Sequence, residues 1–595
     1  MTGASISGAA GDVPRWGSDV IAHTLRALAI PYIALNPGAS YRGLHDSLVN
    51  VLDNERPHML LFLHEEHAVA CAHGYAKVTG QPMGVVLHSN VGLMHAAMAI
   101  FNAYCDRVPI LLIGATGPVD AAQRRPWIDW IHTSADQAAL VRPFIKWDDQ
   151  PASVTASVES LLRGVQLSRT PPCAPVYICL DAAVQEAPLS TRVAVPDTAR
   201  YAAPPPAEPS GRTCAQVATL LSGASKPVLL IGRVSRSVAA WNERVGLGEA
   251  LGAAVITDLK LGAAFPTAHR LHIGAPGFFL SAEARAALLA ADVVVALDWV
   301  DLGGTLRQAW GHENVSARVI SVSVDSHLHA GWAKEYGSLA PVDVPVLAEP
   351  DVFVPLLRAS LPACPPREPW FSPDLAAEGP PATDEVSDSF LSMAELAAAL
   401  QGAVADDPVC LVRLPLGWSG SLWHFTQPLD YLGSDGGGGI GSGPGMSVGA
   451  ALALRDTGVL PVSILGDGDF LMGITALWTA VHEKLPLLIV VANNRSYFND
   501  ELHQDRIAMV RGRNRENRAI GQRLEEPTID LAAMARAQGC HAEGSARTRE
   551  ELDASLAQAV TVARSGGVAV VDAWVQRRYD SEMTVNLTRG GAGWS

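Results

Sequence analysis

Short apolar runs alternate along this chain with longer segments in which apolar residues recur at every third or fourth position. In the first third, Tyr32–Leu35 and Met83–Leu87 predict buried strands, and Glu65–Val78 predicts an alanine-rich helix. The middle third repeats the pattern, with strands expected at residues 227–231, 254–257, 293–297 and 319–324. Continuous apolar strands that alternate with helices are typical of parallel sheets covered on both faces. The pattern predicts an α/β protein with three doubly wound parallel-sheet domains.

Two proline-rich segments interrupt this alternation. Residues 193–212 combine proline with alanine, and residues 361–387 combine proline with acidic residues. Both lack periodicity, so we expect them to be linkers. They divide the chain into three predicted domains at residues 1–192, 213–360 and 388–595.

Composition narrows the class of protein. The chain has 595 residues, of which 48% are hydrophobic, so it can form several large cores. A net charge of −16 argues against nucleic-acid binding, which needs a basic face. The eight cysteines form no CxxC pair, as expected for buried thiols in a reducing compartment. We find no secretory signal and no apolar run of about 18 residues without charge, so we expect a cytoplasmic protein without a membrane partner.

The most informative pattern lies in the last third. The sequence GDGD at residues 466–469 ends one apolar run, and Asn493-Asn494 ends a second. Residues 470–484 between them predict one helix. Strand, helix and parallel strand form a right-handed unit in which the carboxyl ends of both strands meet. Asp467 and Asn494 should therefore face one point, where their oxygens suit a hard cation such as Mg²⁺ or Ca²⁺ beside phosphate.

This pattern resembles the cofactor motif of the thiamine diphosphate (ThDP) enzymes of the decarboxylase and acetolactate-synthase superfamily. Asp467 and Asn494 are 27 positions apart, as are that family's two side-chain metal ligands. The resemblance implies ThDP and Mg²⁺ as cofactors, with Ca²⁺ as a substitute, and a third ligand from the Ser496 carbonyl. It covers nearly the whole chain and implies a pyrimidine-binding (PYR), a central and a diphosphate-binding (PP) domain.

The family also has a glutamate that activates the cofactor at N1′, nine residues before the glycine of a Gly-Tyr-Ala sequence. Gly74 begins such a sequence, which places the glutamate at Glu65, with Glu66 as the rival. Alternatively, Glu65 only favours the positive end of its helix. In the family, the PYR domain of one subunit completes the PP domain of another. The resemblance therefore implies a homodimer or homotetramer with active sites at the subunit interface.

The first third also resembles benzoylformate decarboxylase. His88 lies in a Leu-His-Ser segment whose histidine transfers protons in that family, a role suited to its pKa. A buried histidine bonded to the backbone is the alternative. Residues 36–40 resemble a loop that contacts the substrate carboxylate, although Ala39 replaces a serine and Ser40 lies one position later. His132, with Trp127 and Trp130, is expected to shape the substrate pocket or to pack between domains. A second histidine typical of that family is missing from residues 297–304.

The PP domain supplies the remaining candidates. Ile440 occupies the position of the family's bulky residue that bends the cofactor. The resemblance places further cofactor contacts at Ser419, Ser421, Gly441, Gly466, Gly468 and Asp469. Asp469 replaces a small residue and should turn away from phosphate, cap the helix or reach the metal through water. Glu501 and His503 are acid or base candidates. The arginines of residues 506–523 predict a salt-bridged surface or an anion site.

The resemblance implies cleavage or formation of a C–C bond next to a carbonyl. Non-oxidative decarboxylation of a 2-oxo acid is the preferred reaction. An acetolactate-synthase-like carboligase and a 2-hydroxyacyl-CoA lyase are the alternatives, and a non-catalytic ThDP-binding paralogue is a remote one. FAD is not expected, because His88 argues against the synthase group.

Overall fold

The computed structural model describes residues 13–327, 339–362, 365–371, 390–405, 407–579 and 581–588. The chain divides into two compact units, Met1–Pro205 and Pro206–Ser595. Their boundary lies within the predicted linker at 193–212. Most of the second predicted linker, 361–387, lies outside the described residues. The division into three domains therefore stays a prediction.

The first unit is built on one parallel sheet with the strand order β2-β1-β3-β4-β6-β5. Its strands are β1 (Tyr32–Leu35), β2 (His58–Leu61), β3 (Gly84–Leu87), β4 (Leu111–Thr116), β5 (Trp147–Asp149) and β6 (Val176–Asp181). Its helices are α1 (Gly17–Ala27), α2 (Arg42–Asn50), α3 (Glu65–Thr79), α4 (Ser89–Cys105), α5 (Ile128–Ile131), α6 (Val154–Arg169) and α7 (Ala182–Glu186).

The second unit contains two parallel sheets. The first has the order β11-β10-β9-β7-β8, with β7 (Pro227–Ile231), β8 (Ala254–Ile256), β9 (Val293–Leu297), β10 (Arg318–Val322) and β11 (Val344–Val346). Its helices are α8 (Gly211–Gly223), α9 (Val238–Leu251), α10 (Ala282–Ala290), α11 (Leu302–Trp310) and α12 (Pro350–Ser360).

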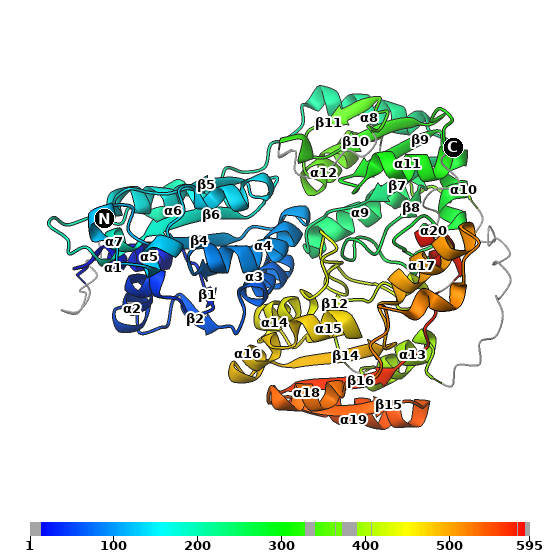
Figure 1. Cartoon of the computed structure of the whole chain (residues 1–595). Coiled ribbons are helices and arrows are strands. Elements are labelled where there is room, and N and C mark those ends of the chain that lie inside the picture. The colour runs from blue at the N-terminus through cyan, green and yellow to red at the C-terminus, as the bar shows by residue number, and fades with distance from the viewer. Residues whose placement is uncertain are drawn as a thin grey trace. The chain divides into compact units, whose positions relative to one another are not determined.

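The other sheet has the order β12-β13-β14-β16-β15, again with every pair parallel. Its strands are β12 (Val409–Arg413), β13 (Leu460–Gly466), β14 (Leu487–Asn493), β15 (His541–Ala546) and β16 (Val568–Trp574). The helices are α13 (Met393–Ala403), α14 (Gly443–Leu454), α15 (Asp467–Gly473), α16 (Ala476–His482), α17 (Phe498–Val510), α18 (Leu531–Ala537), α19 (Arg549–Arg564) and α20 (Ser581–Thr588) (Figure 1).

Each sheet is covered on both faces, as β9 shows. Val293, Val295 and Leu297 belong to one apolar core, and the intervening Val294 and Ala296 belong to another. Successive side chains of a strand point to opposite faces, so a strand buried on both faces must be apolar throughout. The predicted α/β class with three parallel sheets is confirmed.

One predicted element differs. Residues 470–484 were expected to form one helix, but the structure has two, α15 and α16, separated at Ile474 and Thr475. The first of them begins three residues earlier, at Asp467. At its end, Gly473 lies against the Gly441 carbonyl, where an added Cβ would be only 2.4 Å from the oxygen. The interruption therefore lies where the helix backbone packs on the loop before α14.

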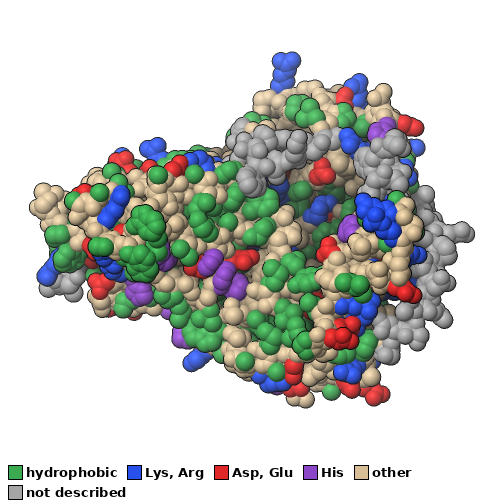
Figure 2. Space-filling model, in the orientation of Figure 1, with side chains coloured by type: hydrophobic (Ala, Val, Ile, Leu, Met, Phe, Trp, Pro, Cys, Tyr) green, Lys and Arg blue, Asp and Glu red, His purple; other side chains and the backbone are tan. Residues whose placement is uncertain are grey.

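The surface carries charges of both signs. On the face shown in Figure 2, lysines and arginines are scattered among acidic side chains. Within the described ranges, no helix is both long and apolar enough to span a membrane.

A buried ion cluster ties α3 to the end of α4. Asp106, which follows α4, accepts hydrogen bonds from Lys77 Nζ at 2.6 Å and from His73 Nε2 at 2.8 Å. Burial acts to raise the pKa of the Asp106 carboxyl, but Lys77 and His73 together hold it well below its usual range. Helix α3 begins with Glu65 and α4 begins directly after His88. The cluster therefore fixes the two helices that position these candidate residues.

We expect Asp106→Asn to lower the free energy of unfolding by about 3–5 kcal/mol, because it leaves Lys77 buried without its counter-charge. The folded-state pKa of Asp106 lies below the unfolded value of about 4, so its stabilisation is present above that value and is lost as the pH falls further. Urea unfolding across a pH series measures both effects, with the exposed Asp120→Asn as the control. Equal stability of the two variants near neutral pH would contradict the role of the cluster.

Candidate active site

The parallel pairing of β13 with β14 brings the GDGD and Asn-Asn sequences together. Gly466 at the end of β13 is paired with Ala492 near the end of β14. The Ser496 backbone N–H then donates to both Asp467 Oδ2, at 3.2 Å, and Asn494 Oδ1, at 2.9 Å. Three predicted metal ligands thus lie at one edge of the sheet.

The two asparagines have different surroundings. The Asn493 amide is buried and donates to Asp572 Oδ1 at 2.9 Å, which ties β14 to β16. Asn494 is partly exposed, and its side-chain oxygen accepts from the Ser496 N–H, which also donates to Asp467. Asn493 therefore supports the sheet, and Asn494 is the residue available to a ligand.

Asp467 is a buried carboxylate whose surroundings suit a cation. Burial raises its pKa to about 6, although the backbone N–H groups of Gly468 and Ser496 donate to it. Asp467 supplies carboxylate oxygens and Asn494 an amide oxygen, the donor types that Mg²⁺ prefers. A divalent cation would remove the cost of burying this charge, so the residues present fit a hard metal ion.

A second buried ion cluster holds the glycine-rich loop before α14. Arg413, at the end of β12, pairs with Asp435 at 2.7 Å and lies 3.4 Å from Asp469. Burial acts to lower the pKa of Arg413, but Asp435 and Asp469 raise it above its usual range. Asp469 Oδ1 accepts the N–H groups of Gly441 at 2.6 Å and Gly443 at 3.2 Å. Asp469 therefore holds the loop at the start of α14. It does not cap the helix that follows it, because it lies inside α15, whose N-cap is Gly466.

The loop leaves Ile440 partly uncovered. Its side chain is 39% exposed, although Gly441 beside it is buried. Gly436, Gly438 and Gly441 all have positive φ, a backbone conformation that favours glycine. Ile440 therefore lies exposed at a turn, and its contact with the cofactor stays a prediction.

The other predicted cofactor residues lie on the segment that follows β12 and at or just after the end of β13. Ser419 and Ser421 follow β12, and their hydroxyls are hydrogen-bonded to each other at 2.9 Å. An added Cβ at Gly466 would meet no atom within 4 Å, whereas one at Gly468 would lie 2.6 Å from the Tyr497 ring. Gly466 thus borders open space, and Gly468 permits close packing.

The segment after Asn494 is more structural than predicted. Glu501 is buried, accepts the Ser496 hydroxyl at 2.6 Å and pairs with Arg523 at 3.0 Å. Burial acts to raise the pKa of Glu501, but Arg523 and Ser496 lower it, which keeps the carboxylate ionised. These contacts favour a role in supporting Ser496 over proton transfer. His503 is exposed on α17.

Several arginines of the predicted cluster are salt-bridged. Arg515 and Arg518 both pair with Asp505, at 2.6 and 3.2 Å, and Arg523 pairs with Glu501. For these three, the arrangement agrees with the expected salt-bridged surface.

In the first unit, the predicted proton-transfer and substrate residues line one cavity. The cavity has a volume of about 120 Å³, and its lining includes Ala39, Ser40, His88 and His132. The rings of His88 and His132 meet edge to face with centroids 4.7 Å apart. Trp127 and Trp130 are 70% and 76% exposed and do not belong to the lining.

His88 is held as a neutral imidazole. Its Nδ1 accepts from the Ser40 N–H at 3.4 Å and lies 2.9 Å from the Ser40 hydroxyl. Burial lowers the pKa of His88, and His132 lowers it further. The Ser40 N–H favours the tautomer in which Nδ1 accepts and Nε2 carries the proton. His88 thus presents a donor beside the cavity.

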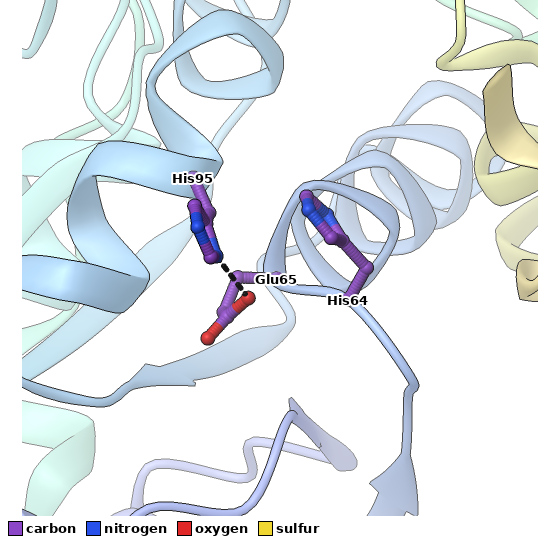
Figure 3. A group of neighbouring side chains, drawn as sticks. All are labelled: His64, Glu65 and His95. Atoms are coloured by element: carbon purple, nitrogen blue, oxygen red, sulfur yellow. Dashed lines mark hydrogen bonds and ion pairs between the residues drawn. The ribbon is translucent and has the colours of Figure 1, made fainter.

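Glu65 is buried at the first turn of α3, the helix end that favours an acid, and it also contacts α4. Its Oε2 accepts a hydrogen bond from His95 Nδ1 at 3.0 Å, across from α4. His64 lies beside them, and Figure 3 shows the two imidazole rings facing each other, with the Glu65 carboxylate next to the His95 ring. Glu66, the rival predicted from sequence, is partly exposed and turns its N–H to His64.

Sequence reasoning missed Arg413, Asp435 and His95. A single arginine ending the apolar run at 409–412 and an aspartate directly before a glycine run were the available signals for the first two. His95 gave no signal, because its role depends on the packing of α4 against α3.

Models of three thiamine pyrophosphate enzyme domains match the chain. They are the N-terminal TPP binding domain at residues 15–140, the central domain at residues 214–357 and the C-terminal TPP binding domain at residues 415–573. The chain therefore belongs to the thiamine pyrophosphate (thiamine diphosphate) enzyme family, as its motifs predicted.

Relatives within the family carry two different activities in their names. Benzoylformate decarboxylase of Pseudomonas aeruginosa is 26% identical over 513 residues, which cover 85% of this chain and 90% of the relative. The acetolactate synthase large subunit of Corynebacterium glutamicum is also 26% identical, over 492 residues, with 80% and 75% covered. At this identity, the relatives do not decide the reaction.

Solved structures agree with the fold. Benzoylformate decarboxylase from Polynucleobacter necessarius superposes with a TM-score of 0.76 at 19% identity, covering 95% of this chain and 99% of that one. A thiamine diphosphate-dependent 4-hydroxybenzoylformate decarboxylase from Rhodococcus jostii gives 0.73 at 22% identity, with 94% and 99% covered.

Asp467→Asn and Asp469→Asn should affect different properties, the first Mg²⁺ binding and the second stability. We expect Asp467→Asn to lose Mg²⁺ binding without loss of stability, because a buried carboxylate is removed. We expect Asp469→Asn to lower the free energy of unfolding by about 1–3 kcal/mol, because Arg413 loses a counter-charge and two N–H groups lose an ionised acceptor. Calorimetric Mg²⁺ titration with ThDP and urea unfolding measure the two effects. Retained Mg²⁺ binding by Asp467→Asn would refute the assignment.

Proposed function

We propose that this protein is a ThDP- and Mg²⁺-dependent decarboxylase of a 2-oxo acid. The observation that carries the proposal is the cavity in which His88 and His132 meet next to Ser40. Bound ThDP supplies the carbanion chemistry of such a reaction. The chain's own residues must bind the substrate, orient it and move protons.

Each residue has a distinct part. Asp467, Asn494 and the Ser496 carbonyl would hold the metal ion, and the loop held by Asp469 would present Ile440 to the cofactor. Glu65 would hold and exchange a proton at N1′. His88 would act as the general acid in its protonated, imidazolium form. It would give one proton to the product carbon after CO₂ leaves and become the neutral imidazole that Ser40 and the lowered pKa favour.

His132 offers a substitute for the second histidine that is missing from residues 297–304. Its ring contacts His88 directly, so it can relay a proton to or from His88. Ala39 and Ser40 line the same cavity, where they would meet the substrate carboxylate. Cytoplasmic location and a homodimer or homotetramer with shared active sites complete the proposal.

Carboligation is the second candidate, favoured by the equal identity to an acetolactate synthase. The two reactions share the loss of CO₂ and differ in the step after it. His88 as a proton donor favours release of an aldehyde, whereas a second carbonyl substrate would be needed for ligation. Product analysis with and without an added aldehyde separates them.

A screen of 2-oxo acids, from small aliphatic to aromatic, tests the proposal. With ThDP and Mg²⁺, we expect CO₂ release from at least one acid and almost none from Glu65→Gln. His88→Ala should lower kcat for aldehyde formation by about 10²–10⁴-fold, the usual effect of losing a general acid or base. His312→Ala is the matched control, because that histidine is exposed and lies outside the predicted site.

Two results would contradict the proposal. The first is absence of CO₂ release from every acid by protein that binds ThDP, which would direct attention to acyl-CoA lyase or acyloin substrates. The second is aldehyde formation by His88→Ala at the wild-type rate.

A further inference from the structure

The contact between His95 and Glu65 is not part of the function proposed above. His95 projects from α4, one turn after Gly92, and its Nδ1 lies 3.0 Å from Glu65 Oε2. Among the described residues, no hydrogen bond to the other oxygen, Oε1, is found. Oε1 faces Gly92, where an added Cβ would lie 3.2 Å away. One oxygen of the carboxylate is therefore fixed and the other is available.

His64 orients His95 from the opposite side. The two imidazole rings are stacked, with centroids 5.0 Å apart and planes 18° from parallel. His64 is itself fixed, because its Nδ1 accepts the Glu66 N–H at 3.2 Å and so caps α3. The hydrogen bond that caps α3 thus fixes the His64 ring. The His64 ring packs on the His95 ring, and His95 in turn holds Glu65 (Figure 3).

Two histidines and a carboxylate within 4.8 Å also suggest a metal site. The hydrogen bonds argue against that function. A neutral imidazole has one lone pair, and that of His64 is engaged by the Glu66 N–H. To bind a metal through Nε2, His64 would have to change tautomer and give up the helix cap. The cluster is therefore better suited to hold a carboxylate than an ion.

We propose that His95 is a positioning residue for Glu65. Its Nδ1–H donates to Oε2 and leaves Oε1, on the Gly92 side, as the one oxygen with which Glu65 would meet the cofactor. This inference rests on the proposed function, in which Glu65 exchanges a proton with the cofactor. A misplaced proton-transfer group loses rate steeply, and a hydrogen bond to a charged acceptor is among the stronger ones.

The first test uses the cofactor-free protein, labelled with ¹⁵N at histidine. The ¹⁵N shifts of the His95 ring should show the Nδ1–H tautomer, because the hydrogen bond to Glu65 selects it. In Glu65→Ala this preference should disappear. A His95 ring that carries its proton on Nε2 in the wild-type protein would overturn the proposal without reference to activity.

The second test measures hydrogen–deuterium exchange at C2 of bound ThDP. His95→Ala should slow exchange by about tenfold to a hundredfold, with a much smaller change in ThDP affinity. His95→Asn keeps a donor near the position of Nδ1 and should restore most of the rate. His312→Ala, at an exposed histidine of the second unit, is the matched control.

The outcomes separate this proposal from the one on which it rests. If Glu65→Gln abolishes exchange but His95→Ala exchanges at the wild-type rate, the positioning role is overturned and the function of Glu65 stands. If Glu65→Gln exchanges normally, both fall. Slow exchange in His95→Ala with recovery in His95→Asn supports both.

Discussion

The site depends first on the parallel pairing of β13 with β14. Their register places Gly466 beside Ala492, so that the residues after each strand must share one space. Asp467 and Asn494 then converge on the same Ser496 N–H without any long-range folding of loops. A slip of one residue would turn each side chain to the other face, and the apolar cores on both sides of the strands oppose such a slip.

Buried charges support the candidate site from three clusters. Arg413 is shared between Asp435 and Asp469, Glu501 is held by Arg523, and Asp106 is held by Lys77 and His73. These clusters fix the glycine loop, the segment after Asn494 and the α3–α4 pair. Asp467 differs from Glu501 and Asp106, because burial raises its pKa to about 6, the property expected of a carboxylate that binds a cation. The ion pairs thus hold the surrounding segments in place, and the Asp467 carboxylate is the one suited to bind a cation.

How much the sequence predicts depends on how local each feature is. The strands and the α/β class were predictable because every parallel strand buried on both faces must be apolar along its length. The proximity of Asp467 and Asn494 was predictable, because each lies at the carboxyl end of one of two neighbouring parallel strands. The break between α15 and α16 was not, because it depends on Gly473 meeting the Gly441 carbonyl across the fold. The partners of Asp469, Glu501 and Glu65 were hidden for the same reason: Arg413, Arg523 and His95 come from other segments, and only packing decides which charges meet.

The central claim is that Asp467, Asn494 and Ser496 form one metal site at the end of β13 and β14. Crystals grown with ThDP and Mn²⁺ in place of Mg²⁺ would test it through anomalous diffraction, because Mn²⁺ accepts the same oxygen ligands. The account predicts one strong peak bound by the Asp467 carboxylate, the Asn494 amide oxygen and the Ser496 carbonyl. A peak elsewhere, or ThDP bound with no metal at these residues, would contradict it.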